Sequence, residues 1–323
     1  MNFYKTIPAY KDYIWGGNKL KEYYGKKTDT VPLAESWELS CHKDGMSYLS
    51  NGMSLEEYIA NNKGCLGTAC PSDELPVLIK FIDAQDNLSV QVHPTDEQAR
   101  AWENQNGKTE MWYVANAEKD AKITCGFNRD VTEDELKKAI EENTLEELLS
   151  IYDSEKGDVF FVEAGTVHAI GKGNLIVEIQ QNSNVTYRLY DYNRVGKDGK
   201  TRELHIEKGI KASNCKKTIL KNKEGSVLAK CKYFKVTEIK FSGEIKLCAD
   251  ETSYHALVIV EGNVKLCDES FSAGETIFIP AGGIDFSCVY AYCLADVAGT
   301  AHGPGRNSVR HCKTSYIPWL RPA

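Results

Sequence analysis

Short apolar runs, bounded at brief intervals by turn residues, dominate the hydrophobic pattern of this chain. They are rich in Val, Ile, Phe and Tyr, which favour strands. Such runs are typical of an all-β sandwich or barrel. The predicted strands cover residues 75–82, 88–94, 110–114, 122–127, 158–162, 175–181, 235–241, 255–262 and 276–282.

Helix signals are fewer and take the form of capping boxes, in which Ser or Thr is followed three residues later by Glu or Gln. They begin at Ser54, Thr95, Thr132 and Thr144. Apolar residues at helical spacing follow the last two boxes. The pattern therefore predicts a pair of helices over about 130–153, between two blocks of strands.

An internal repeat indicates how the chain is organised. GDVFFVEAGTVH (157–168) aligns with GETIFIPAGGID (274–285) at an offset of 117 residues, and EMWYV from Glu110 aligns with HALVIV from His255 at an offset of 145. The offsets differ by about the length of the predicted helix pair. We therefore predict two copies of one β-domain, at 1–225 and 226–323, with a helical insertion at about 130–153 in the first. The lysine-rich ILKNKEG (219–225) is the expected boundary.

Composition narrows the function classes. The chain has 323 residues and a formal charge of −7, without a basic stripe, which is unfavourable for binding nucleic acid. No apolar stretch reaches the ~18 residues of a membrane span. The N-terminus lacks the apolar core of a secretory signal, and the eleven cysteines include no CxxC pair. We expect a cytoplasmic protein with reduced thiols, as a monomer or a small homo-oligomer, without nucleic-acid or membrane partners.

Four polar residues on predicted strands indicate a metal site. Gln91 and His93 are two residues apart, so they share one face of a strand. Glu110 opens the next strand, and His168 follows a glycine turn. Two imidazoles, a carboxylate and an amide suit Zn²⁺, with Fe²⁺, Mn²⁺ or Ni²⁺ as alternatives. Inward positions of separate strands can converge on such an ion inside a barrel.

The amino-acid sequences of these motifs resemble those of a known protein family. GDVFFVEAGTVHAIG looks like the second signature of the cupin superfamily, with QVHP and GKTE in the place of the first. The ordered series WGG, ESWE, LPVLIK, LSVQVHP, GKTEMWYV, AGTVHAIG and VEIQQNSNVTYRLYDYNR resembles the type I mannose-6-phosphate isomerases in their short bacterial form. The resemblance covers more than half of the chain. It implies two cupin-like jelly-roll β-barrel domains.

The resemblance also implies roles for individual residues. Gln91, His93, Glu110 and His168 would bind one zinc ion. Arg188, Glu178 and Lys108 would act in catalysis, and Ser89, Lys80 and Arg194 would bind the substrate and its phosphate. Glu178 lies among apolar neighbours, so it is either a buried ion-pair partner of Arg188 or a site carboxylate that positions Arg188 or shares in proton transfer.

The implied activity is the zinc-dependent interconversion of mannose 6-phosphate and fructose 6-phosphate through a cis-enediol. The general base stays open among Glu178, Asp191, a metal-bound water and a ligand histidine. Two alternatives are an Fe(II) cupin dioxygenase and a non-catalytic sugar-phosphate-binding cupin. Asp285 stands where His168 does and nothing like Gln-x-His precedes it, so we expect residues 226–323 to be metal-free.

Overall fold

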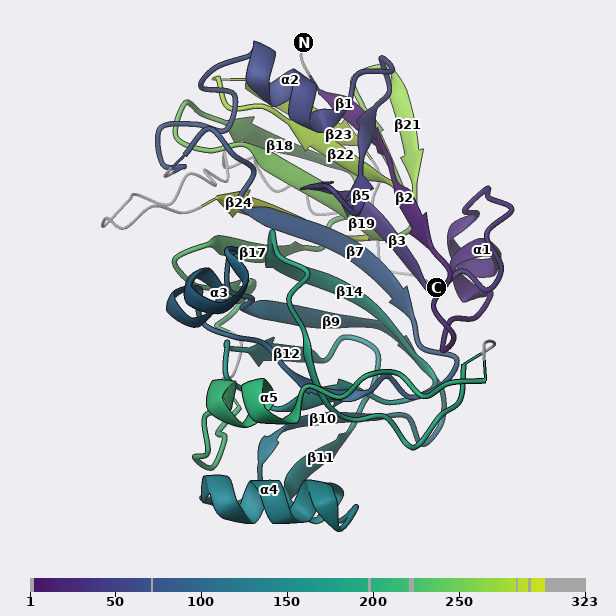
Figure 1. The fold of residues 1–323 in the computed structure, drawn as a ribbon. Helices are drawn as coiled ribbons and strands as arrows, with labels where there is room; N and C mark the ends of the chain where they lie inside the picture. The colour runs from purple at the N-terminus through teal and green to yellow at the C-terminus, as the bar shows by residue number, and fades with distance from the viewer. Residues whose placement is uncertain are drawn as a thin grey trace.

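The computed structural model describes residues 3–70, 72–196, 199–220, 224–282, 284–289 and 292–299, the last two ranges as backbone only. Four antiparallel β-sheets are stacked between helix α2 at one end and helix α4 at the other (Figure 1). The helices are α1 (Lys19–Tyr24), α2 (Leu55–Asn61), α3 (Asp96–Glu103), α4 (Glu133–Glu141), α5 (Ile206–Ala212) and the 3₁₀ turn η1 (Leu145–Leu148). Among the described residues, none of these helices has the length and apolar character needed to cross a bilayer.

Two sheets form the first sandwich. One has six strands in the order β12 (Val159–Val162), β9 (Glu110–Ala117), β14 (Asn174–Gln181), β7 (Val77–Asp83), β3 (Glu35–Leu39) and β2 (Ala9–Lys11). The other has five, in the order β11 (Leu149–Asp153), β10 (Lys122–Phe127), β13 (His168–Ile170), β8 (Val90–Val92) and β15 (Tyr187–Tyr190). A separate two-stranded hairpin, β4 (Cys41–His42) and β5 (Gly45–Met46), packs against Trp37 of β3.

Two further sheets form the second sandwich. The seven-stranded sheet has the order β16 (Val227–Lys230), β17 (Phe234–Ile239), β24 (Tyr292–Gly299), β19 (His255–Glu261), β22 (Thr276–Ile279), β1 (Tyr4–Ile7) and β6 (Tyr48–Leu49). The four-stranded sheet has the order β18 (Glu244–Ala249), β23 (Ile284–Val289), β20 (Asn263–Leu266) and β21 (Glu269–Ser272). The N-terminal strand β1 thus crosses the expected boundary at residue 225, because it pairs with β22.

The layers explain why the central strands are apolar on both faces. In β7, Ile79 and Phe81 belong to the core between the six- and seven-stranded sheets. Ile82 points the other way, into the core shared with the five-stranded sheet. A strand buried on both sides reads as a continuous apolar run. Lys80 interrupts that run on the side of the five-stranded sheet, which is where the site lies.

Pairing registers match the predicted repeat. Val162 of β12 lies opposite Glu110 of β9, and Ile279 of β22 lies opposite His255 of β19. These are the residues that the two sequence offsets make equivalent. The orders β12-β9-β14-β7 and β22-β19-β24-β17 also correspond, as do β11-β10-β13-β8 and β21-β20-β23-β18. The expectation of a mostly β fold is confirmed, but the sheets do not close into the implied jelly-roll barrels: in the described residues no ladder joins the edges of the two sheets of a sandwich.

The insertion lies between β10 and β11, at residues 128–148, where the second copy has only residues 267 and 268 between β20 and β21. Its first helix, α4, begins at Thr132 with a complete capping box. The second predicted helix is wrong, since Thr144 makes no side-chain cap and η1 ends after one turn. Leu149 enters the ladder with β10 immediately afterwards, so strand pairing overrides the helical spacing of the leucines.

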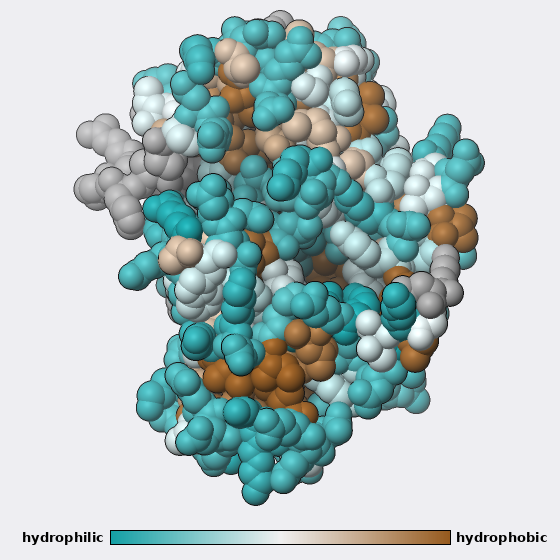
Figure 2. All heavy atoms as spheres, in the orientation of Figure 1, coloured by the Kyte–Doolittle hydropathy of each residue, from teal (hydrophilic) through white to brown (hydrophobic). Residues whose placement is uncertain are grey.

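The outer face of the five-stranded sheet is covered by α4, α5 and η1, whose apolar side chains form one core with Val90, Val92 and Ala169. Hydrophilic residues dominate the surface seen in Figure 2, in keeping with the charged composition. The opposite, inner face of this sheet meets the six-stranded sheet, and that space contains both an apolar core and the polar site.

Candidate metal centre and its cavity

Strand alternation places the predicted ligands inside the first sandwich. Val90 and Val92 pack outward against the helices, so Gln91 and His93 point inward. In the neighbouring strand β13, His168 lies directly opposite Gln91 in the antiparallel register. Glu110 comes from the facing six-stranded sheet, at the start of β9. The sequence prediction of a shared inner face is confirmed by this geometry.

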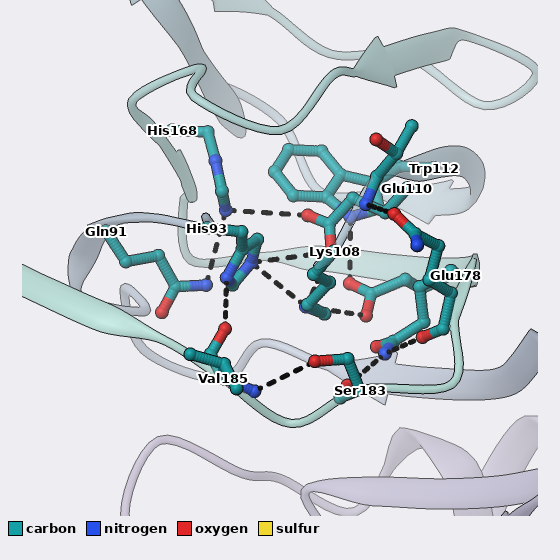
Figure 3. Close-up of polar contacts among 12 residues, drawn as sticks. Gln91, His93, Lys108, Glu110, Trp112, His168, Glu178, Ser183 and Val185 are labelled. Atoms are coloured by element: carbon teal, nitrogen blue, oxygen red, sulfur yellow. Dashed lines mark hydrogen bonds and ion pairs between the residues drawn. The ribbon is translucent and has the colours of Figure 1, made fainter. Parts of the chain in front are cut away.

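Three of the predicted residues form a compact donor group, with their ligand atoms all within 4.8 Å of one another. His93 Nε2 lies 3.5 Å from Glu110 Oε2, and His168 Nε2 lies 3.4 Å from Glu110 Oε1. Figure 3 shows both rings directed toward the carboxylate. All three side chains are buried. Within the described part of the chain, this is the only cluster of three or more His, Cys, Asp or Glu side chains able to hold a metal.

Backbone carbonyls set the tautomer of both histidines. His93 Nδ1 donates to Val185 O at 2.9 Å, and His168 Nδ1 donates to Thr166 O at 2.8 Å. Each Nε2 is therefore left unprotonated, which is the form that binds metals. Burial lowers the pKa of His168 to about 4. Burial and the charge of Lys108 also hold the pKa of His93 well below its usual value. Both rings are neutral at pH 7.

The environment of Glu110 fits a bound cation. The Lys108 ammonium lies 2.6 Å from its Oε2, whereas its buried Oε1 has no hydrogen-bond partner among the described residues. Burial, followed by repulsion from Glu178, raises the pKa of Glu110 to about 7. The Lys108 ammonium contacts both His93 Nε2, at 3.0 Å, and Glu110 Oε2. On the other side the His168 lone pair faces Glu110 Oε1 across 3.4 Å, which is unfavourable without positive charge between them. His93, Glu110 and His168 accordingly fit a divalent ion.

Gln91 lies at the edge of this group. Its Nε2 is 3.4 Å from His168 Nε2, and its Oε1 accepts a hydrogen bond of 3.3 Å from Ser89. A half-turn of the carboxamide exchanges these two atoms, and would direct the oxygen toward the ion. The role of Gln91 as a fourth ligand stays a prediction.

Alternating charges run inward from β3 to the metal group. Lys80 lies 3.4 Å from Glu35 and 3.0 Å from Glu178. Lys108 lies 3.5 Å from Glu178 and 2.6 Å from Glu110. All five side chains are buried. Three carboxylates and two ammonium groups leave one negative charge in excess, which a divalent cation would more than neutralise.

Glu178 and Lys80 are cross-strand neighbours in β14 and β7. Burial raises the pKa of Glu178, but Lys108 and Lys80 outweigh it and lower the value to about 2. Burial acts against the charge of Lys80, yet Glu178 and Glu35 raise the pKa of Lys80 above its usual value. Of the two alternatives for Glu178, the ion pair with Arg188 is wrong, because the strand register places Glu178 beside the two lysines; its role as a site carboxylate stays a prediction.

A cavity of about 270 Å³ lies beside the metal group. It is lined by most of the predicted site residues, together with residues that the sequence did not indicate. The predicted ones are Lys80, Ser89, Gln91, Lys108, Glu178 and Arg188. Arg188 donates through Nη1 to Glu203 O at 2.7 Å, while its buried Nε has no hydrogen-bond partner among the described residues.

Arg194 is not among the residues that line this cavity. Its guanidinium bonds to Asp191 at 2.6 Å and approaches Asp86 at 3.5 Å. Arg202 lines the cavity instead and donates to both carboxylate oxygens of Asp191, sharing Oδ1 with Arg194. A sequence signal that could have indicated Arg202 is Gly-Lys-Asp-Gly at 196–199, which is typical of a turn. A turn there would bring Arg202 back beside the residues that precede it. The bridge between Val195 and Thr201 is that return.

Two tryptophans that the sequence analysis did not identify donate hydrogen bonds to carboxylates among the alternating buried charges from Glu35 to Glu110. Trp112 Nε1 donates to Glu178 at 2.8 Å, and Trp37 Nε1 donates to Glu35 at 2.5 Å. Tyr13 and Trp15 stack at the cavity wall, with ring centroids 5.5 Å apart. The cavity therefore combines an aromatic wall, a charged interior and a metal-binding group, which suits a small polar anion.

Comparisons with known proteins agree with this geometry. A family model described as the phosphomannose isomerase type I catalytic domain matches residues 3–127. Mannose-6-phosphate isomerase ManA of Bacillus subtilis (strain 168) is 36% identical over 306 residues, covering 89% of this chain and 96% of the relative. The mannose-6-phosphate isomerase of Streptococcus mutans serotype c is 35% identical over 284 residues, covering 83% and 89%.

Solved structures give the same result. The crystal structure of the mannose 6-phosphate isomerase from Bacillus subtilis has a TM-score of 0.83 and 29% identity, over 92% of this chain and 99% of that chain. With relatives above 30% identity along most of its length, and with the metal group in place, the chain belongs to the type I phosphomannose isomerase family.

Proposed function

We propose that this protein is a zinc-dependent aldose–ketose isomerase that interconverts mannose 6-phosphate and fructose 6-phosphate. The observation that carries the proposal is the meeting of His93, Glu110 and His168 beside a cavity lined by lysines and arginines. Family membership adds to it, since the named relatives are mannose-6-phosphate isomerases. Two histidines and one glutamate with an open position are a donor set of catalytic zinc sites.

The reaction moves one proton between C1 and C2 and another between their oxygens. When bound, zinc would supply Lewis-acid stabilisation of the enediolate oxygens, worth several kcal/mol. His93 and His168 would hold it as neutral ligands, because their Nδ1 protons are bound to backbone carbonyls. Glu110 would supply the one anionic ligand.

Lys108 would stabilise negative charge at the reacting end. Its ammonium lies 3.0 Å from His93 Nε2 and also lines the cavity, so it can donate a hydrogen bond to an oxygen of a sugar placed there. Glu178 keeps Lys108 and Lys80 charged in a buried setting. Its own low pKa makes it a weak base, so it serves the lysines better than it serves proton abstraction.

Arginines would bind the phosphate, which carries about −1.5 to −2 charges at neutral pH. Arg188 and Arg202 line the cavity, and the unpaired Nε of Arg188 is a donor ready for an anion. Ser89 would add a hydroxyl donor. Anchoring the phosphate and the carbonyl end together fixes the C2 proton in one place, which is how binding energy is used to lower the barrier.

The test is a coupled assay with zinc-loaded protein, in which mannose 6-phosphate is the substrate and fructose 6-phosphate is detected. Unphosphorylated mannose is the matched control and should be converted poorly. Absence of turnover with mannose 6-phosphate and other sugar phosphates would refute the proposal. Oxygen uptake with Fe²⁺ would instead favour the dioxygenase alternative, and metal analysis of the purified protein checks the assignment of zinc.

A further inference from the structure

The short segment 106–109 carries Lys108 and leads directly into Glu110, and its backbone is held at successive positions. Ser183 Oγ donates to Asn106 O at 2.7 Å, and Lys108 N donates to Pro94 O at 3.1 Å. Gly107 N donates to Asp96 Oδ1 at 3.0 Å. Thr109 N donates to Gln181 Oε1 at 2.8 Å. Side chains from outside the metal group therefore determine where this segment lies.

Gly107 shows how closely the segment approaches the start of α3. A Cβ at this position would lie 2.5 Å from the backbone nitrogen of Asp96 and 2.5 Å from the carbonyl carbon of Thr95. No side chain fits there without moving one of the two backbones. The hydrogen bond from Gly107 to Asp96 is thus made at the closest approach of the two segments.

Asp96 joins this segment to the second sandwich. Its Oδ1 accepts from Gly107 N and, at 2.9 Å, from Gln181 Nε2. Its Oδ2 accepts from Tyr233 Oη at 2.7 Å and from Lys232 Nζ at 3.1 Å. Lys232 and Tyr233 lie in the turn between β16 and β17. One carboxylate therefore contacts the catalytic segment on one side and the second copy of the repeat on the other.

Asp96 is well suited to this role because it stays charged. Burial raises its pKa, but hydrogen bonds from Tyr233, Gln181 and Lys232 outweigh that effect and lower the value to about 2. Hydrogen bonds to an ionised acceptor are about twice as strong as neutral ones.

We propose that Asp96 is a positioning residue, through which Tyr233 of the second sandwich fixes the segment that carries Lys108 and Glu110. An effect of Asp96 on catalysis rests on the proposed function. The position of the metal group, in contrast, can be tested without it. Through this contact the second sandwich helps to position the metal group, in addition to packing against the first sandwich. Partners outside the ligand set commonly change metal affinity or activity by about 10- to 100-fold when removed.

The experiment compares three variants of the full chain. Asp96→Ala removes the carboxylate, and Tyr233→Phe removes only the hydrogen bond from the second sandwich. Glu97→Gln is the matched control, since it removes a charge from the same first turn of α3 at an exposed residue that, unlike Asp96, makes none of the hydrogen bonds to Gly107, Gln181 or Tyr233. Zn²⁺ affinity is measured by chelator competition, ligand geometry by the visible spectrum of the Co²⁺ form, and segment order by hydrogen exchange of residues 105–110.

We expect Asp96→Ala to weaken Zn²⁺ binding by about 10- to 100-fold and to change the Co²⁺ spectrum. Tyr233→Phe should weaken Zn²⁺ binding by about 2- to 10-fold, as for one hydrogen bond. Both should speed exchange in 105–110, and Glu97→Gln should match wild type in every readout. If Asp96→Ala does not fold, Tyr233→Phe carries the test.

Wild-type Zn²⁺ affinity, Co²⁺ spectrum and exchange rates in a folded Asp96→Ala or Tyr233→Phe variant would overturn the proposal. The outcome for the isomerase assignment is separate. Tight zinc binding without turnover in wild type, together with weakened binding in Asp96→Ala, would refute the isomerase and support the positioning role. A wild-type protein that binds neither Zn²⁺ nor Co²⁺ would overturn both.

Discussion

The two sandwiches share one strand order but differ in what fills them. Strand register makes Glu110 equivalent to His255, Trp112 to Leu257, and Lys80 to Thr237. The interior of the second sandwich is an apolar cluster of residues such as Leu257, Ile259 and Phe271. The interior of the first is divided between an apolar cluster and the buried charges.

This difference teaches that the fold by itself creates no metal site. The ladder positions of Glu110, Trp112 and Lys80 in the first copy hold an imidazole, an aliphatic side chain and a hydroxyl group in the second. Burying charges costs free energy unless each is paired, so the first sandwich needs the whole series from Glu35 to Glu110 and not the ligands alone. At the positions of Trp112 and Lys80 the second sandwich has Leu257 and Thr237, so it is free of that cost there and apolar packing stabilises it.

The largest expected effect comes from removing a histidine of the metal group in one copy, compared with removing the histidine at the Glu110 position in the other. His93→Ala or His168→Ala should abolish metal binding and lower turnover by about 1,000-fold or more, because several kcal/mol of Lewis-acid stabilisation is lost. His255→Gln should leave the metal content unchanged. Metal analysis and the coupled assay check both. Metal loss in His255→Gln equal to that in His168→Ala would end the distinction between the copies.

The next largest effect is expected for the alternating buried charges from Glu35 to Glu110. Lys80→Met should reduce the free energy of unfolding by about 3–5 kcal/mol, because Glu35 and Glu178 lose a buried partner. Thr237→Val, at the equivalent position, should change it by less than about 2 kcal/mol. Urea unfolding measures both. A Lys80→Met protein as stable as wild type would show that the lysine is not paired in the way described.

A metal that binds only the folded state should raise the stability of the protein. At a zinc concentration 100 times the dissociation constant, the gain is about 2.7 kcal/mol, and chelation should remove it along with activity. The melting temperature of wild type should therefore rise with zinc, and that of His168→Ala should not. An equal rise in both proteins would place the binding site elsewhere.

The smallest expected effect separates two arginines. Arg202→Ala should raise the KM for the sugar phosphate by about 10- to 100-fold, the value of a charge-assisted hydrogen bond, while Arg194→Ala should have a smaller effect. Steady-state kinetics of the two variants, with the metal content checked, decides between them. The reverse order would restore the sequence-based assignment of Arg194 to the phosphate.

Much of the site was open to prediction because it depends on local spacing. Gln91 and His93 share a face by strand alternation, and Glu110 and His168 follow recognisable motifs. The strand 122–127 was predicted to the residue. The ion-pair partner of Glu178 was not predicted, because Lys80 lies 98 positions earlier in the chain and contacts Glu178 only through the β7–β14 register.

The sequence by itself indicated nine of the strands, the repeat, helix α4 of the insertion and the three side chains of the candidate metal group, since alternation and turn chemistry act over a few residues. Only the tertiary structure decided which charges pair, that Arg202 rather than Arg194 reaches the cavity, that the sheets stay open and that β1 joins the second sandwich. These outcomes depend on register and packing between segments far apart in the chain, and no local pattern encodes them.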